Sequence, residues 1–215
     1  MSWYAKRGDT SQEDFKKKGS RPDVFRFWLE NGTSRDVVFL DDQGFGIWEH
    51  VVKVGDDYHN VTCRMDGCML CNHPDKKFRY KSYVECYNVF DLQPYEKDGK
   101  KFPGSRRLLA VKGEAQQKAL ARRRDAAGGT LVGKKVNISR DGDKSPASGS
   151  DFNVVGEFDL TKLPEKMRPY ELEKVLAPLG DKDLEYLLKA KTGNFSDTES
   201  VSTTSSPEDD SDIPF

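Results

Sequence analysis

Three of the four cysteines in this chain, Cys63, Cys68 and Cys71, lie within nine positions, and this cluster limits the fold more than any other feature. Cys68 and Cys71 form a Cys-x-x-Cys pair, whose thiolates can bind one ion from a tight turn. Cys63 can reach the same ion across the intervening Asp66-Gly67. Because a closed structural zinc site needs four ligands, and Cys₃His is a standard set, the sequence predicts a structural Zn²⁺ in an irregular segment over residues 58–77.

The fourth ligand stays open on residue chemistry alone, since the chain has three histidines: His50, His59 and His73. A redox-active Cys-x-x-Cys and three unrelated buried thiols are the alternatives to a metal site. A redox pair usually follows a strand and opens a helix, a context that this segment does not predict. Cys86 lies within a predicted aromatic strand, so we expect it to be a small core residue.

The composition indicates a lean core and an uneven distribution of charge. Hydrophobic residues make up 35% of the chain and charged residues 33%, and no apolar run is long enough for a membrane span or a signal-peptide core. Residues 196–215 hold six acids and no Lys or Arg, so the remainder carries a net charge of +5. We expect a mobile N-terminal arm over 1–22, one domain over 23–192 and a disordered acidic tail over 193–215.

Hydrophobic alternation predicts that the domain is mainly β, in the α+β class. Residues 25–29 and 35–41 flank Asn31-Gly32, which predicts a β-hairpin. The other expected elements are strands over 47–52, 78–90, 131–140 and 152–160, a loop over 91–107, a flexible connector over 141–150, and helices over 115–127, 170–176 and 182–190. Five or six strands with one interposed helix favour a small barrel over a doubly wound sheet.

Aromatic and basic side chains alternate in several of these strands. A sheet face that carries both kinds suits single-stranded nucleic acid, because bases stack on rings and cations follow the phosphates. The alternative is that the rings are core and the basic residues form a solvated rim. The candidate DNA contacts are Arg26, Trp28, Arg79, Lys81, Tyr83, Tyr87, Lys134, Arg140 and Lys144, the last on the 141–150 connector.

Motifs for catalysis are missing from the sequence. It has no Walker-type loop, no Gly-x-Ser-x-Gly and no His-Glu-x-x-His, and Glu49-His50 is in the wrong order for a zinc deaminase. We therefore expect a protein that is not an enzyme. A zinc-containing DNA-processing enzyme such as a nuclease is the main alternative, and an adaptor that binds only proteins is another.

Two motifs together resemble known families. The end of the chain, Asp209-Asp210-Ser211-Asp212-Ile213-Pro214-Phe215, closely resembles the acidic Ile-Pro-Phe tip of bacterial single-stranded-DNA-binding proteins. The spacing His50-x12-Cys63, followed by Cys68-x2-Cys71, is similar to the zinc site of the helix-destabilising protein of the T-even phages. The chain thus resembles a phage-type single-stranded-DNA-binding protein.

That resemblance implies a fold, a function and partners. It implies an OB-fold core of five strands with zinc held in a loop, and it favours His50 as the fourth ligand. It implies sequence-independent binding of single-stranded DNA in phage replication, recombination and repair, in the cytoplasm of a bacterial host and away from membranes. It also implies that a tail tip recruits replication and repair enzymes, through Asp209, Asp210, Asp212, Ile213, Pro214 and Phe215.

Overall fold

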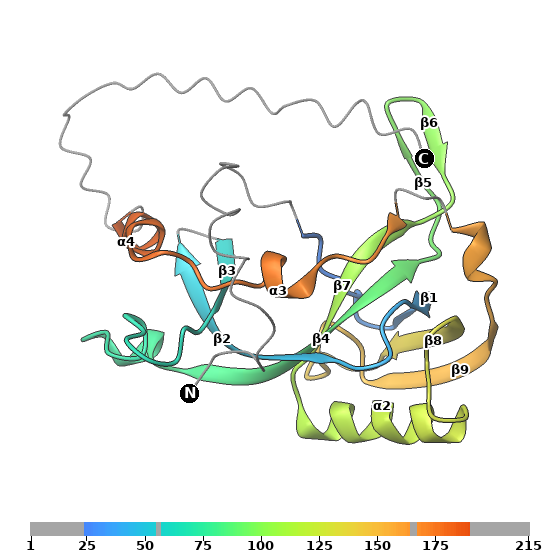
Figure 1. The fold of residues 1–215 in the computed structure, drawn as a ribbon, viewed down its shortest axis with the longest axis horizontal. Helices are drawn as coiled ribbons and strands as arrows, with labels where there is room; N and C mark the ends of the chain where they lie inside the picture. Colours follow the sequence, from blue (N-terminus) through green and yellow to red (C-terminus); the bar gives the residue numbers. More distant parts are fainter. Residues whose placement is uncertain (1–23, 55–56, 164–166, 190–215) are drawn as a thin grey trace.

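The computed structural model describes residues 24–54, 57–163 and 167–189 (Figure 1). The arm predicted over 1–22 and the acidic tail predicted over 193–215, with its partner-binding tip, lie outside the described residues. The described part is mainly β, with one large antiparallel sheet and few helices. None of its helices is long and apolar enough to cross a membrane.

The main sheet has seven strands in the order β3-β2-β4-β1-β8-β9, and β7 also pairs with β4. These strands are β1 (Thr33–Phe39), β2 (Phe45–Val54), β3 (Asp57–Thr62), β4 (Lys81–Asp91), β7 (Ser105–Val111), β8 (Lys134–Arg140) and β9 (Asp151–Glu157). A separate hairpin consists of β5 (Tyr95–Lys97) and β6 (Lys100–Phe102). The helices are α2 (Glu114–Ala126), α3 (Leu172–Val175) and α4 (Asp181–Lys189), with 3₁₀ turns at Lys76–Phe78 and Leu160–Lys162. Among the described residues no strand pairing closes the sheet into the predicted barrel.

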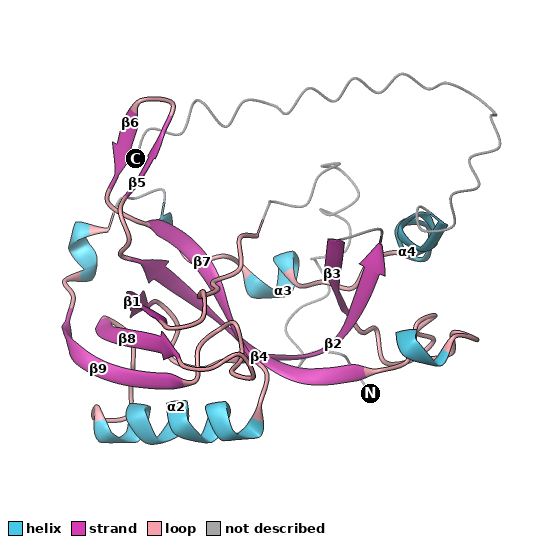
Figure 2. Cartoon of the chain, turned by 180° about the vertical axis from the view of Figure 1, so that it is seen from behind, coloured by secondary structure: helices cyan, strands magenta, loops and turns pink. Residues whose placement is uncertain are grey.

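Helices cover both faces of this sheet, as Figures 1 and 2 show. On one face Leu120 of α2 packs into a cluster that includes Val89 of β4. On the other face Val175 of α3 packs into a cluster that includes Val84 of β4. Side chains at odd spacing along a strand point to opposite sides, so β4 contributes to both cores.

The hairpin predicted around Asn31-Gly32 is wrong, because β1 pairs with β4 and β8 instead. Residues 25–27 run parallel to β7 through one bridge: the Phe27 N–H donates to the Leu108 carbonyl and the Leu108 N–H donates to the Phe25 carbonyl, both at 2.9 Å. The predicted alternation is correct at residues 27–29, where Phe27 and Leu29 are buried and Trp28 is 53% exposed. It is wrong at Phe25, which is exposed.

Two predicted irregular segments contain strands. β3 begins one residue before 58–77 and otherwise lies within it. β5 and β6 lie within 91–107, and β7 begins there and ends at Val111. Pro103 and Gly104 suggest a loop, and the adjacent Arg106 and Arg107 hide the apolar run that follows. The predicted strands near β2, β4, β8 and β9 and the helices near α2, α3 and α4 are confirmed, with shifted ends.

Candidate metal centre and nucleic-acid surface

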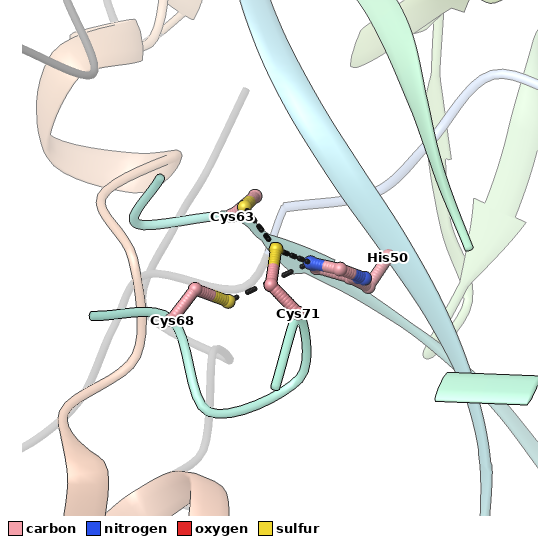
Figure 3. A group of neighbouring side chains, drawn as sticks. All are labelled: His50, Cys63, Cys68 and Cys71. Carbon is pink, nitrogen blue, oxygen red and sulfur yellow. Dashed lines mark hydrogen bonds between the residues drawn. The ribbon is translucent and has the colours of Figure 1, made fainter. Parts of the chain in front are cut away.

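His50, Cys63, Cys68 and Cys71 converge on one point, as Figure 3 shows, and their ligand atoms all lie within 4.8 Å of one another. Cys71 Sγ is 3.5 Å from both His50 Nε2 and Cys63 Sγ, and Cys68 Sγ is 3.6 Å from His50 Nε2. Tetrahedral bonds of about 2.3 Å to sulfur and about 2.0 Å to nitrogen separate ligand atoms by about 3.5–3.8 Å. The cluster can therefore hold a metal ion, and its donors and spacing are compatible with zinc.

The sheet and a tight loop bring these four residues together. His50 lies on β2, and Cys63 directly follows β3, where its N–H donates to the Trp48 carbonyl at 2.7 Å. The loop then turns back through two left-handed residues, Met65 with φ 67° and Gly67 with φ 68°. Gly67 adopts this conformation without the steric cost that a side chain brings. The turn returns the chain in time for Cys68 and Cys71 to face His50.

The imidazole of His50 is oriented for metal binding. Its Nδ1 lies 3.0 Å from the Tyr80 carbonyl oxygen, which can only accept, so Nδ1 carries the hydrogen and donates. Nε2 then presents its lone pair to the three thiols. Burial lowers the pKa of His50, which also favours the neutral ring that a metal requires.

The thiols have unequal environments. Burial raises the pKa of Cys63 to about 12. Burial also acts to raise the pKa of Cys68, but hydrogen bonds from the Cys71 and Leu70 backbone and from the Cys63 thiol lower it overall. Zn²⁺ with three thiolates has a net charge of −1, and Lys81 Nζ, 3.8 Å from Cys71 Sγ, lies where it offsets that charge.

The other histidines are engaged elsewhere. His59 is exposed on β3. His73 Nδ1 accepts the Asp75 N–H at 3.1 Å, and its ring packs edge-on against Phe78. Cys86 is fully buried in the core beneath α3, as predicted, and burial raises its pKa to about 12. Of the three histidines, His50 is thus the one that lies with the clustered thiols.

Three of the predicted DNA contacts also hold loops and strands in place. Arg79 donates to the His73 carbonyl at 2.6 Å, within the metal-binding segment. Arg140 donates to the Leu29 carbonyl at 2.8 Å and to the Ser145 carbonyl at 3.2 Å. Lys134 pairs with Glu157 across β8 and β9. Another predicted contact, Lys144, is exposed on the 141–150 connector. Its neighbour Asp143 accepts a hydrogen bond from Asn31.

Tyr87, another predicted DNA contact, is a core residue. It is 6% exposed and packs edge-on against Phe39, with ring centroids 5.6 Å apart. Its hydroxyl donates to Glu85 at 3.0 Å, and burial raises its pKa. With 6% of its surface exposed, Tyr87 offers less ring to a base than Trp28 or Tyr58 does.

Two other predicted contacts, Lys81 and Tyr83, lie beside the metal cluster. Tyr83 pairs across β2 and β4 with Trp48, and the two rings meet edge-on at 5.7 Å. Lys81 Nζ lies 5.4 Å from the Trp48 ring, so this amine contacts both the ring and the Cys71 thiol. Gly46 makes room for the Tyr83 ring, because a Cβ there would lie 2.2 Å from its hydroxyl. We call Trp48 and Tyr83 the metal-side ring pair.

The opposite face of β2 carries a second polar group centred on Glu49. Since side chains alternate along a strand, Glu49 points away from the side that carries Trp48 and His50. It is 1% exposed and pairs with Arg26 at 2.5 Å and with Lys112 at 2.9 Å. Lys112 also donates to Asn60 of β3 at 3.4 Å. The predicted DNA contact Arg26 is therefore held by a buried carboxylate.

Exposed rings extend this group at both ends. Tyr58, two residues before Asn60 on β3, is 67% exposed, and Lys53 lies opposite it with Nζ 5.5 Å from the ring. Trp28, two residues after Arg26, is 53% exposed. We call this surface the basic strip, and define it as Trp28, Arg26, Lys112, Asn60, Tyr58 and Lys53, with Glu49 beneath.

Sequence reasoning found Trp28 and Arg26 but missed the rest of the basic strip. Tyr58 and Asn60 fall in the segment predicted to be irregular, and Lys112 follows β7, which the sequence pattern does not predict. Alternation of Tyr58 and Asn60 with Val61 was the available indication.

A comparison with models of protein families gives no match, and a comparison with curated proteins gives none either.

Proposed function

We propose that this chain binds single-stranded DNA without sequence preference, in phage replication, recombination and repair, and that its metal is structural. The basic strip is the observation that carries the proposal. It combines three cations with one buried acid and places two exposed rings, Trp28 and Tyr58, at its ends.

This combination suits an unpaired strand better than a duplex. Each base that stacks on a ring contributes about 1–3 kcal/mol, and every base has a face that can stack. A duplex keeps its bases stacked on one another, so the two rings would contribute little there. The cations contact phosphates, which carry no sequence information. Phosphate contacts and stacking on any base therefore predict weak base preference. The need for unpaired bases at the rings predicts a preference for single strands.

The metal centre supports a structural role. Four protein ligands complete a tetrahedral zinc site, whereas a catalytic zinc keeps one position open for water or substrate. Within the described ranges, no second group of His, Cys, Asp or Glu is close enough to hold an ion. A nuclease remains the alternative, and it would shorten single strands when Mg²⁺ or Mn²⁺ is added.

Three parts of the proposal come from the family resemblance. An OB-type relationship is proposed for the sheet around β4, although the strands form no closed barrel. The tail over 193–215 is proposed to recruit replication and repair enzymes. The bacterial cytoplasm is the proposed place of action.

Ring substitutions on the two faces test the location of the binding surface. Trp28→Ala and Tyr58→Ala should each weaken binding of an oligothymidylate by about 1–3 kcal/mol, measured by fluorescence anisotropy. Tyr83→Ala removes a 40% exposed ring from the opposite face and should leave the affinity unchanged. Tyr186→Ala, on α4 and 71% exposed, is a second control. If Tyr83→Ala weakens binding and the strip variants do not, the DNA surface is the metal side.

A further inference from the structure

Glu49 uses both carboxylate oxygens to hold two cations. Oε1 accepts from Lys112 Nζ at 2.9 Å and from Arg26 Nη1 at 3.3 Å, and Oε2 accepts from Arg26 Nη2 at 2.5 Å. The two basic side chains remain 26% and 37% exposed, whereas the carboxylate is 1% exposed. The acid lies beneath the surface, and the cations lie at it.

The pairing leaves part of each cation available. A guanidinium carries five N–H groups, of which Glu49 takes two. An ammonium carries three, of which Glu49 and Asn60 take two. The remaining donors belong to two cations whose positions a buried group fixes. Fixed donors of this kind match phosphate oxygens, for which arginine is well suited.

We propose that Glu49 is a positioning residue for nucleic acid: it touches no DNA but holds Arg26 and Lys112 where both can bind the phosphates of one strand. The inference rests on the proposed function. It adds a role in DNA binding for the acidic residue Glu49, whose charge is opposite to that of the phosphate-binding residues. On charge alone the opposite result is expected, because removing an acid from a DNA-binding surface should strengthen binding.

The positioning role has a physical cause. Long basic side chains lose rotamer freedom when they bind, and this loss weakens association. Glu49 orders both side chains before DNA binds. Their rotamer entropy is therefore lost when the chain folds and not when DNA binds. When the carboxylate is absent, Arg26 and Lys112 must be ordered by the phosphate itself, and one or both contacts are lost.

Two substitutions of Glu49 separate position from charge. Glu49→Gln keeps the shape and an acceptor oxygen but removes the negative charge. Glu49→Asp keeps the charge but withdraws the carboxylate by one methylene group. We expect each variant to weaken binding about 5–10-fold, although one changes the net charge and the other does not.

The experiment titrates the full chain with a labelled oligothymidylate of about 20 nucleotides, longer than the roughly 4–16 nucleotides that an OB-type domain covers. Affinity is measured across a range of salt concentrations. Each lost phosphate contact should reduce the slope of log K against log salt by about 0.7. Melting curves and metal content of both variants show whether they are folded, which matters because Glu49 precedes the metal ligand His50.

The outcomes separate this inference from the proposal beneath it. If the unchanged chain does not bind the oligonucleotide, the proposed function is wrong, and the role of Glu49 falls with it. If the unchanged chain binds, tighter binding by Glu49→Gln overturns the positioning role alone. Unchanged affinity and salt slope in a folded Glu49→Asp variant overturn it as well.

Discussion

Cysteine serves two purposes in this protein. Cys63, Cys68 and Cys71 share a cluster with His50, within reach of one metal ion. Cys86 lies in the apolar core beneath α3, where its thiol packs as a small hydrophobic group. Sequence spacing distinguished the two uses, because close spacing of thiols is needed for a metal site and not for a core. Spacing could not identify the histidine, which depends on how β2 places His50 over the loop.

Replacing one cysteine of each kind tests this distinction. Cys68→Ser should abolish zinc binding and lower Tm by about 10 °C or more. Structural zinc contributes several kcal/mol to stability, on the order of 10 in small peptides. In a chain of this size, each kcal/mol of lost stability lowers Tm by about 2–4 °C. Cys86→Ala should lower Tm through a core cavity but retain one zinc per chain. Metal analysis of reduced protein with a melting curve measures both. Full zinc retention by Cys68→Ser would contradict the site.

Surface residues were harder to predict than the metal ligands. Arg26 and Trp28 were identified by alternation with buried Phe27, a local pattern. Glu49 looks like any other acid in the sequence, and only the fold shows that it is buried between Arg26 and Lys112. Contacts between residues so far apart in the chain depend on strand order, which a single sequence does not reveal.

β4 organises the whole sheet and explains which elements were predicted. Its first half pairs with β2, and its second half pairs with β1 and β7. The long aromatic and β-branched run of β4 made it easy to predict. β7 was missed because its exposed Arg106 and Arg107 precede the apolar Leu108 and Leu109. Barrel closure was also predicted but depends on strand pairing, which local sequence patterns do not determine.

α4 stabilises the metal-binding segment through one buried side chain. Leu184 is 5% exposed and packs in a cluster with Val61, Cys63 and Leu70. Leu184→Ala should lower the free energy of unfolding by about 2–4 kcal/mol and speed zinc loss to a chelator. Tyr186→Ala, on the exposed side of the same helix, should change stability by less than about 0.5 kcal/mol. Equal effects of the two substitutions would show that α4 does not support the site.

An ion pair across β1 and β8 makes the stability of the fold depend on pH, and the direction of the pKa shift gives the sign of this dependence. Asp36 pairs with Lys135 at 2.8 Å and accepts from Asn137 at 2.7 Å, and these contacts lower the pKa of Asp36. A lowered pKa stabilises the fold above the unfolded value of about 3.9, and this contribution is lost as pH falls through the folded value.

Urea unfolding of the unchanged chain and of Asp36→Asn at pH values above and below about 4 measures this contribution. The unchanged chain should lose more stability on acidification than the variant. Metal loss at low pH affects both proteins and cancels in the comparison. The same loss in both would show that Asp36 contributes nothing to acid sensitivity.

Across the molecule, β2 separates two surfaces that carry different groups of side chains. Its metal-facing side carries His50 and Trp48, and its other side carries Glu49 beneath the basic strip. A metal ion in the cluster would join β2, the end of β3 and the following loop, and β2 and β3 also carry Lys53, Tyr58 and Asn60 of the basic strip. The proposed division assigns stability to one face and DNA binding to the other.

The basic strip sets the expected salt dependence of binding. Each phosphate neutralised on a single strand contributes about −0.7 to the slope of log K against log salt. Two or three contacts from Lys53, Arg26 and Lys112 give a slope of about −1.4 to −2.1. Lys53→Gln, which leaves the Glu49 pairs intact, should make the slope shallower by about 0.7. A slope near zero in the unchanged chain would exclude phosphate contacts.

The most direct test of the proposed function compares single-stranded and duplex DNA of one mixed sequence, at equal length and salt, by anisotropy titration of the full chain. Two exposed rings that stack on unpaired bases at about 1–3 kcal/mol each should make the single strand bind at least about tenfold more tightly. Equal or tighter binding of the duplex, or no binding of the single strand, would contradict the account.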